Sequence, residues 1–353
     1  MRSTRIAVTF LGIVLMSCSQ SQHSESDGIL EPYRLTDGPG GAVMVLRHDS
    51  VLYGKAFGRA DVEAGTAVTF ATNFRLASVT KQFTAMAVMI LVDRGKVSLE
   101  QRLTDFFPDF APVGRKITLK HLLTHTSGIV AYEDVMPEST TVPLLDKDVL
   151  QLLKNIDSTH SLPGSEFRYS NSGYALLALV VEKASGVSFA RFLKENIFLP
   201  LGMSNTVAYE RGVSEVPHRA YVYSVDTGKA GRCERTDQSL TSSVLGDGGI
   251  YSSISDLQKW DAALTAGSLV REKTLQEMLS RSAVIDTGKT WYGYGWYTGS
   301  MDGVPLYYHG GSTVGFRTCI VRIPDRSLTV IALFNRSDVE SEKICLKLAR
   351  LYF

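Results

Sequence analysis

Ser78 and Lys81 are the two residues whose types and spacing best suit catalysis. They stand at the start of an apolar segment, Thr80–Arg94, which predicts a buried helix ending at Gly95. Side chains three residues apart share one face of a helix, so the hydroxyl and the amine can meet. The helix N-terminus favours negative charge on the serine oxygen, and a lysine among apolar neighbours loses its proton more readily. The pair therefore predicts a serine nucleophile beside an amine, although Ser-x-x-Lys alone is a weak signal.

Two later segments strengthen this prediction. Tyr169-Ser-Asn171 precedes a predicted helix, and His309-Gly-Gly311 precedes a predicted strand. In this order the three elements resemble the serine penicillin-binding proteins and β-lactamases, in particular the class C branch with its Ser-x-x-Lys, Tyr-x-Asn and Lys-Thr-Gly elements. The resemblance runs from about residue 41 to residue 335, and the flanking sequences that share it are Phe74–Lys81, Leu122–Gly128 and Pro163–Asn171.

The resemblance implies a role for each of these residues. Ser78 is expected to form an acyl-enzyme, while Lys81 and Tyr169 take its proton and Tyr169 later returns one. Asn171 is expected to hydrogen-bond the Lys81 region and the acyl-side amide of the substrate. The backbone N–H groups of Ser78 and Ser312 would form the oxyanion hole. No cofactor and no metal are expected.

The third element departs from the family pattern. His309, Gly310 and Gly311 are expected to bind substrate, yet His309 is only partly charged at neutral pH and Gly310 has no hydroxyl. A substrate carboxylate therefore loses its usual partners unless Arg317 or Arg322 replaces them. The predicted function is a serine hydrolase acting on small-molecule or peptide-like amides or esters. An esterase, rather than a β-lactamase or peptidase, is one alternative, and a non-catalytic envelope-binding protein is another.

The N-terminus predicts export. A positive segment, Met1–Arg5, precedes the eleven-residue apolar run Ile6–Met16, which is too short to span a bilayer. The following Leu15-Met-Ser-Cys18 resembles the lipobox of bacterial lipoproteins. We therefore expect a signal peptide over residues 1–17, a lipid on Cys18, a flexible polar tether over residues 18–30, and a membrane-anchored protein at the periplasmic face of the cell envelope. An ordinary signal peptide is the alternative.

Composition excludes several other classes of protein. The chain has 353 residues, 44% of them hydrophobic, which excludes a disordered chain. Its 37 basic and 36 acidic residues give a net charge of +1, so binding to nucleic acid is not expected. His121 and His125 lack the glutamate of a zinc-protease motif, which favours a structural role. The spacing of Cys233, Cys319 and Cys345 excludes a zinc knuckle and leaves open one disulfide or three free thiols.

The pattern of predicted elements indicates an α/β protein. Strand pairs are expected at both ends of the chain with helices between them, so one antiparallel sheet would be built from distant segments, flanked by terminal helices, with a mostly helical lobe inserted. In the catalytic domain, residues 31–353, the α/β lobe would take about 31–77 and 240–353, and the helical lobe about 78–239. The expected strands are Gly41–Arg47, Val51–Phe57, Trp291–Thr298, Gly315–Ile323 and Leu328–Phe334. The expected helices are Thr80–Arg94, Thr118–Thr126, Gly173–Ser185, Ser188–Ile197, Ser255–Ala266 and Asp338–Phe353.

Overall fold

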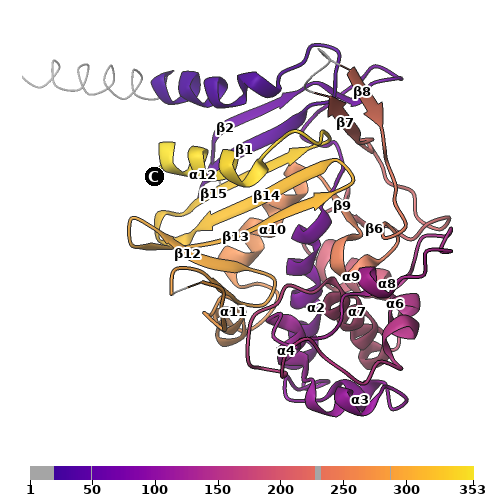
Figure 1. The fold of residues 1–353 in the computed structure, drawn as a ribbon. Coiled ribbons are helices and arrows are strands. Elements are labelled where there is room, and N and C mark those ends of the chain that lie inside the picture. The colour runs from indigo at the N-terminus through magenta and orange to yellow at the C-terminus, as the bar shows by residue number, and fades with distance from the viewer. Residues whose placement is uncertain (1–19, 49, 227–231, 287) are drawn as a thin grey trace, which may run out of the picture.

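Strands from the two ends of the chain pair side by side in one large antiparallel sheet (Figure 1). The computed structural model describes residues 20–48, 50–226, 232–286 and 288–353. The strand order is β10-β11-β12-β13-β14-β15-β1-β2. The strands are β1 (Gly41–Arg47), β2 (Ser50–Phe57), β10 (Ala283–Val284), β11 (Trp291–Tyr292), β12 (Tyr297–Met301), β13 (Val304–Thr313), β14 (Phe316–Ile323) and β15 (Leu328–Phe334). The predicted α/β class with an antiparallel sheet is confirmed.

Strands β1 and β15 are buried on both faces of the sheet. β1 pairs with β15 from Gly41 opposite Phe334 to Arg47 opposite Leu328. Alternate β1 side chains enter different cores: Ala42, Met44 and Leu46 face one, and Val43 and Val45 face the other. Two buried faces explain why these strands are nearly continuous runs of apolar residues.

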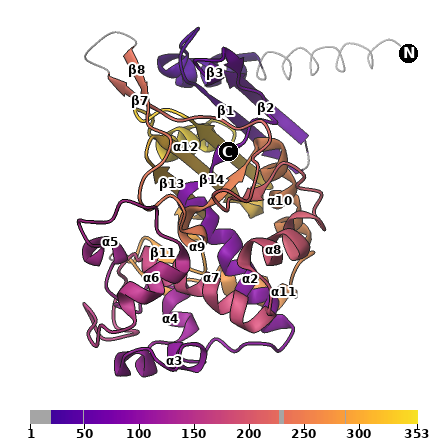
Figure 2. The same cartoon turned by 90° about the vertical axis from the view of Figure 1, so that its right-hand side faces the viewer.

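Helices cover both faces of the sheet (Figures 1 and 2). The C-terminal helix α12 (Ser341–Leu351) packs on one face, and α10 (Ile254–Ala266) and α2 (Thr80–Asp93) lie on the other. Residues 20–30, expected to be a flexible tether, are instead helical and lie beside α12. Their Ser26 hydroxyl is hydrogen-bonded to the Tyr352 hydroxyl at 3.1 Å, and Asp27 accepts a hydrogen bond from Tyr53.

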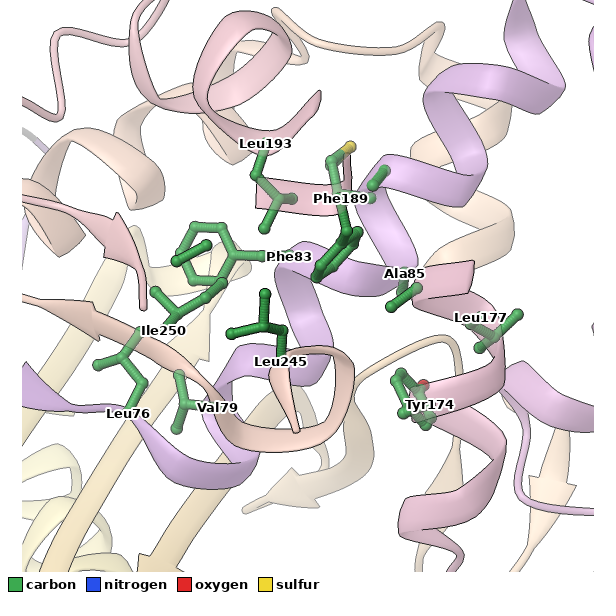
Figure 3. Close-up of a cluster of buried hydrophobic side chains, with 14 of the residues drawn as sticks. Leu76, Val79, Phe83, Ala85, Tyr174, Leu177, Phe189, Leu193, Leu245 and Ile250 are labelled. Atoms are coloured by element: carbon green, nitrogen blue, oxygen red, sulfur yellow. The ribbon is translucent and has the colours of Figure 1, made fainter. Parts of the chain in front are cut away.

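The helical region packs on the sheet through one continuous core, part of which is shown in Figure 3. Phe83 of α2 and Leu245 lie in this cluster with Leu76 and Val79, which flank the candidate nucleophile. The remaining helices are α3 (Leu103–Phe106), α4 (Leu119–Leu123), α5 (Tyr132–Val135), α6 (Asp146–Leu153), α7 (Asn171–Ser185), α8 (Phe189–Leu193), α9 (Leu245–Gly248) and α11 (Glu272–Met278). Three small sheets are formed by β3 (Arg59–Asp61) with β4 (Thr66–Ala67), by β5 (Phe74–Arg75), β9 (Ile250–Ser252) and β6 (Val207–Ala208), and by β7 (Tyr223–Asp226) with β8 (Arg232–Arg235).

Several elements differ from the sequence prediction. The single strand expected at 291–298 is two strands, because Gly295 turns the chain with a φ of 78°. The helix expected at 118–126 ends at Leu123, and the one expected at 188–197 passes from α8 into a π-helical turn at Lys194–Phe198. His309-Gly-Gly311 lies within β13, a strand that the sequence analysis did not predict. Within the described ranges, no helix is both long and apolar enough to cross a membrane.

Candidate active site

Ser78 lies in a tight turn where the sheet meets the helical region. It belongs to the 3₁₀ turn Ala77–Val79, which precedes α2, rather than to the first α-helical turn as predicted. The turn is held from two sides, since the Leu76 carbonyl accepts a hydrogen bond from Thr318 of β14 at 2.7 Å and the Leu76 N–H donates to Ile250 of β9 at 2.8 Å. Ala77 has a φ of 49°, which costs energy for a residue with a Cβ. Strain just before a candidate nucleophile shows that the surrounding structure fixes its position.

Lys81 is buried and its amine meets the Ser78 hydroxyl, as the spacing predicts. The distance between Nζ and Oγ is 3.2 Å. Nζ also lies 2.8 Å from Asn171 Oδ1 and 2.9 Å from the Asp247 carbonyl oxygen. Burial lowers the pKa of Lys81, and the charges of Asp247 and Glu133 offset part of that effect. The amine is therefore easier to deprotonate than that of an exposed lysine.

The sequence analysis did not predict Asp146 and Asp247. Asp247 contacts Lys81 directly, and Asp146 holds the helix that carries Asp247. The Asp146 carboxylate accepts hydrogen bonds from the N–H groups of Leu245 and Gly246 at 2.9 and 3.0 Å, and so fixes α9. α9 presents the Asp247 carbonyl to Lys81. The Asp247 carboxylate accepts a hydrogen bond from Tyr132, and burial raises its pKa. Leu245-Gly-Asp-Gly248 is a turn-like sequence that gives no sign of this contact.

Tyr169 is brought to the same centre from the helical region. Its ring lies 4.8 Å from Lys81 Nζ and 4.2 Å from the His125 ring, measured to ring centroids. Burial raises the pKa of Tyr169, and the neighbouring Ser78 hydroxyl offsets part of the rise. Its own hydroxyl has no well-aligned hydrogen-bond partner among the described residues. Tyr169 therefore stays protonated at neutral pH, with a buried hydroxyl available to a bound substrate.

Two hydrogen bonds orient the segment that carries Tyr169. His125 Nδ1 accepts a hydrogen bond from the Ser170 N–H at 3.0 Å, and Ser170 in turn caps the N-terminus of α7. Asn171 Oδ1 accepts from Lys81, as expected, while its Nδ2 donates to Glu133 at 2.8 Å. The contact expected between Asn171 and a substrate amide stays a prediction; Glu133 uses one of the two N–H donors of Asn171 Nδ2.

His309 is a neutral, fully satisfied side chain, not the partial cation that the sequence suggested. It is 1% exposed, with Nδ1 2.6 Å from the Gly310 carbonyl and Nε2 2.9 Å from the Tyr292 hydroxyl. Burial lowers the pKa of His309 to about 3, and the charge on Lys81 acts in the same direction. At neutral pH His309 therefore offers no positive charge to a substrate carboxylate.

Gly311 allows β13 to approach the nucleophile. A Cβ at this position would lie 2.2 Å from the Leu76 carbonyl oxygen and 3.1 Å from the Ser78 nitrogen. A side chain there would push the strand away and move Ser312, the second predicted oxyanion donor. Ser78, Tyr169, His309, Gly310, Gly311 and Ser312 all line one pocket of about 420 Å³. The structure thus brings the predicted residues of the strand and of the helical region together.

The two arginines considered as partners of a substrate carboxylate, Arg317 and Arg322, lie in different places. Arg322 is buried and binds Asp261 at 2.5 Å and the Thr265 hydroxyl at 2.7 Å, so it serves the packing of α10 on the sheet. Arg317 lines the pocket with Ser78, and its guanidinium donates to the Phe316 carbonyl at 2.9 Å. Arg322 is therefore not a substrate ligand, and Arg317 is the arginine within the pocket.

The histidines and cysteines that the sequence analysis singled out lie outside the catalytic pocket or outside the described residues, apart from His309. His121 and Thr118 cap α4 reciprocally, at 3.3 and 3.2 Å. Cys233, Cys319 and Cys345 are free thiols, which settles the choice that the sequence left open. In the part of the chain that the structure describes, no three His, Cys, Asp or Glu side chains are grouped to hold a metal. Cys18 and the predicted signal peptide lie outside the described residues.

Comparisons of the sequence and the structure with known proteins identify the family of this chain. The family model described as Beta-lactamase matches residues 32–352. The chain belongs to the Beta-lactamase family. Penicillin-binding protein 4* of Bacillus subtilis (strain 168) is 32% identical to this β-lactamase-family chain over 324 residues, which are 88% of this chain and 71% of the relative.

Other members place the chain in the same group. A D-aminopeptidase of Brucella anthropi is 28% identical, over 84% of this chain and 56% of the relative, so the chain spans little more than half of that protein. The crystal structure of a penicillin binding protein from Bacillus halodurans is 27% identical with a TM-score of 0.80, over 93% of this chain and 99% of that one. The predicted class, a serine hydrolase related to β-lactamases and penicillin-binding proteins, is confirmed.

Proposed function

We propose that Ser78 forms an acyl-enzyme from esters or amides and that Lys81 is the base that takes its proton. The observation that carries this proposal is the set of three contacts made by Lys81 Nζ, to Ser78, Asn171 and Asp247. A neutral amine has two N–H donors and one lone pair. Since Asn171 Oδ1 and the Asp247 carbonyl can only accept, the lone pair is left for the Ser78 hydroxyl. This arrangement is that of a general base.

Tyr169 completes the proton path in this mechanism. Ser78 Oγ bonds to the substrate carbonyl carbon while its proton moves to Lys81, and the N–H groups of Ser78 and Ser312 stabilise the oxyanion by about 3 kcal/mol each. Tyr169 then gives its hydroxyl proton to the leaving group as the bond to the carbonyl carbon breaks, and it regains a proton from Lys81. Water attacks the acyl-enzyme by the reverse path, which regenerates Ser78.

We further propose that esters are cleaved faster than β-lactams. His309 is neutral and hydrogen-bonded within the protein, and Gly310 has no hydroxyl. A lost hydrogen bond to a charged group costs about 1.5–3 kcal/mol, which is a factor of about ten to a hundred or more in acylation. An ester without a carboxylate needs no such anchor.

Intact-protein mass spectrometry tests these proposals. The protein is exposed in turn to a fluorophosphonate, benzylpenicillin and p-nitrophenyl butyrate, and kcat/KM is measured for the last two. We expect covalent labelling that is lost in Ser78→Ala and kept in Ser165→Ala, an exposed serine away from the pocket. Labelling that persists in Ser78→Ala would overturn the nucleophile, and no labelling by any probe would favour a non-catalytic binding protein.

We also propose that a lipid on Cys18 anchors the protein at the periplasmic face of the envelope. The apolar run and the lipobox-like Leu15–Cys18 support this location. Since the chain is helical from residue 20, two residues after Cys18, the anchor would hold the catalytic domain close to the membrane. Native protein should partition with membranes and carry lipid on Cys18, and Cys18→Ala should be released. Equal membrane binding of both proteins would contradict the anchor.

A further inference from the structure

Glu342 reaches into the catalytic pocket from α12, a helix that the proposed mechanism does not use. The residue follows Ser341 at the start of that helix and lines the same pocket as Ser78 and Tyr169. Its carboxylate occupies the space beside Gly310, because a Cβ built at position 310 would lie 1.9 Å from Glu342 Oε1. Where the family pattern has a threonine hydroxyl, this chain therefore has a glycine covered by a carboxylate.

The charge of Glu342 is not balanced by a neighbouring cation. Its carboxylate has no hydrogen-bond or ion-pair partner among the residues that the structure describes. The adjacent Lys343 pairs with Glu340 at 2.5 Å, and Arg317 donates to a backbone carbonyl. Glu342 is an exposed residue at the mouth of the pocket, where partial burial raises its pKa, and its charge raises the pKa of Tyr169, Tyr297 and Tyr308. Glu342 thus acts electrostatically on the residues around the nucleophile.

Glu342 lies on the side of the site where the leaving group of a substrate is expected to depart. In the proposed mechanism the leaving group departs past Tyr169, which protonates it. Glu342 and Tyr169 line one pocket with Ser78, whereas Asn171, the residue expected to meet the acyl-side amide, is hydrogen-bonded to Lys81 and Glu133 and is not among the residues that line this pocket. A charged substituent on the leaving group would therefore enter the pocket beside Glu342.

We propose that Glu342 is a specificity-determining residue that rejects substrates with a carboxylate on the leaving group and favours leaving groups that carry a positive charge. This inference rests on the proposed acyl-enzyme function. A substrate carboxylate beside Glu342 meets a like charge at short range, and like-charge contacts in a binding site select against the wrong partner. A cationic leaving group instead gains an opposite charge in the same place. A threonine at position 310 would force the Glu342 carboxylate to move from its place beside Gly310.

Three aryl acetates whose leaving groups carry a positive, no or a negative charge test this inference. They are 3-acetoxy-N,N,N-trimethylanilinium, phenyl acetate and 3-acetoxybenzoate, measured by kcat/KM on wild type, Glu342→Gln and Glu215→Gln. The last variant makes the same charge change at an exposed residue outside the catalytic pocket. Comparison between proteins cancels the different reactivities of the esters.

We expect the ratio of the cationic to the carboxylate ester to fall at least tenfold in Glu342→Gln and to stay as in wild type in Glu215→Gln. An unchanged ratio in Glu342→Gln, or a wild type that prefers the carboxylate ester, would overturn the inference and would assign the leaving-group pocket to Arg317. Cleavage of phenyl acetate and labelling of Ser78 test the proposed acyl-enzyme function separately from the role of Glu342. If phenyl acetate is cleaved and Ser78 is labelled while the ratio does not respond, only the role of Glu342 fails. If neither occurs, the proposed function fails as well.

Discussion

Asp247 lies beside Lys81 and influences how readily that amine loses its proton. Its charge raises the pKa of Lys81 against the lowering effect of burial. In Asp247→Asn this charge is gone, while the side chain can still accept the hydrogen bond from Tyr132. The pKa of Lys81 should fall further, and in the proposed mechanism a neutral Lys81 is the form that accepts the proton of Ser78.

The resulting prediction concerns the acid limb of the pH profile. Wild-type kcat/KM should rise with pH through the lowered pKa of Lys81, below the value of about 10.4 for an ordinary lysine. In Asp247→Asn the limb should move to lower pH by on the order of one unit. Ester hydrolysis measured from about pH 5 to about pH 10 shows this shift. A limb that stays in place or moves to higher pH would mean that Lys81 does not act as the neutral base.

At the scale of elements, α6 fixes α9, and α9 contacts the helix that carries Lys81. Asp146 binds two N–H groups of α9, whose carbonyls then accept hydrogen bonds from Thr84 at 2.7 Å and from Lys81 at 2.9 Å. Asp146→Ala leaves two buried donors without a partner, at about 1–3 kcal/mol each. We expect a lower melting temperature together with a drop in kcat that exceeds any change in KM.

The isosteric variant Asp146→Asn separates positioning from stability alone. Its one remaining carboxamide oxygen can accept a hydrogen bond, so kcat should recover part of the way toward wild type. Thermal unfolding and ester kinetics on both variants check whether kcat in Asp146→Asn lies between that of Asp146→Ala and that of wild type. If Asp146→Ala lost stability with kcat intact, α9 would have no part in placing Lys81.

At the scale of the whole molecule, buried histidines tie stability to pH. His309 has a pKa of about 3 in the fold because of burial, against about 6.5 when unfolded. Its contribution to stability is therefore present above about pH 6.5 and is lost as the pH falls, because only the unfolded chain then takes up the proton. His309→Gln cannot take up that proton.

The stability advantage of wild type over His309→Gln should consequently shrink at low pH. From about pH 7 to about pH 4.5, the difference in unfolding free energy should fall by about 2–3 kcal/mol. Urea denaturation at both pH values measures it. A difference that stays constant or grows would show that His309 is protonated in the native fold.

Local patterns in the sequence were sufficient for the elements and for part of the site. Apolar periodicity predicted β1, β14, β15 and the helices α2 and α7, because these elements are buried and their side chains must alternate or share a face. β2 was predicted from its Val, Leu and Tyr residues although only Tyr53 in it is buried. The three-residue spacing of Ser78 and Lys81 predicted their contact, since the helical backbone alone brings such side chains together. The Gly-Tyr-Gly sequence before Trp296 could have indicated the turn that divides the predicted aromatic strand.

Only the tertiary structure decided the charge and the hydrogen bonding of the pocket. The ring nitrogens of His309 are neutral and satisfied because β11 and β13 bury them, and burial is a property of packing that a residue type does not reveal. Residues 20–28 are polar, yet they are helical because Ser26 and Asp27 are hydrogen-bonded to Tyr352, at the end of α12, and to Tyr53 of β2, and because Leu30 is buried in the core beneath α12. Glu342 is distant in sequence from Gly310 and reaches it only because α12 packs on the sheet at that point. The sequence by itself thus predicted the contact between Ser78 and Lys81 through local geometry, whereas the charge of the pocket depends on long-range contacts.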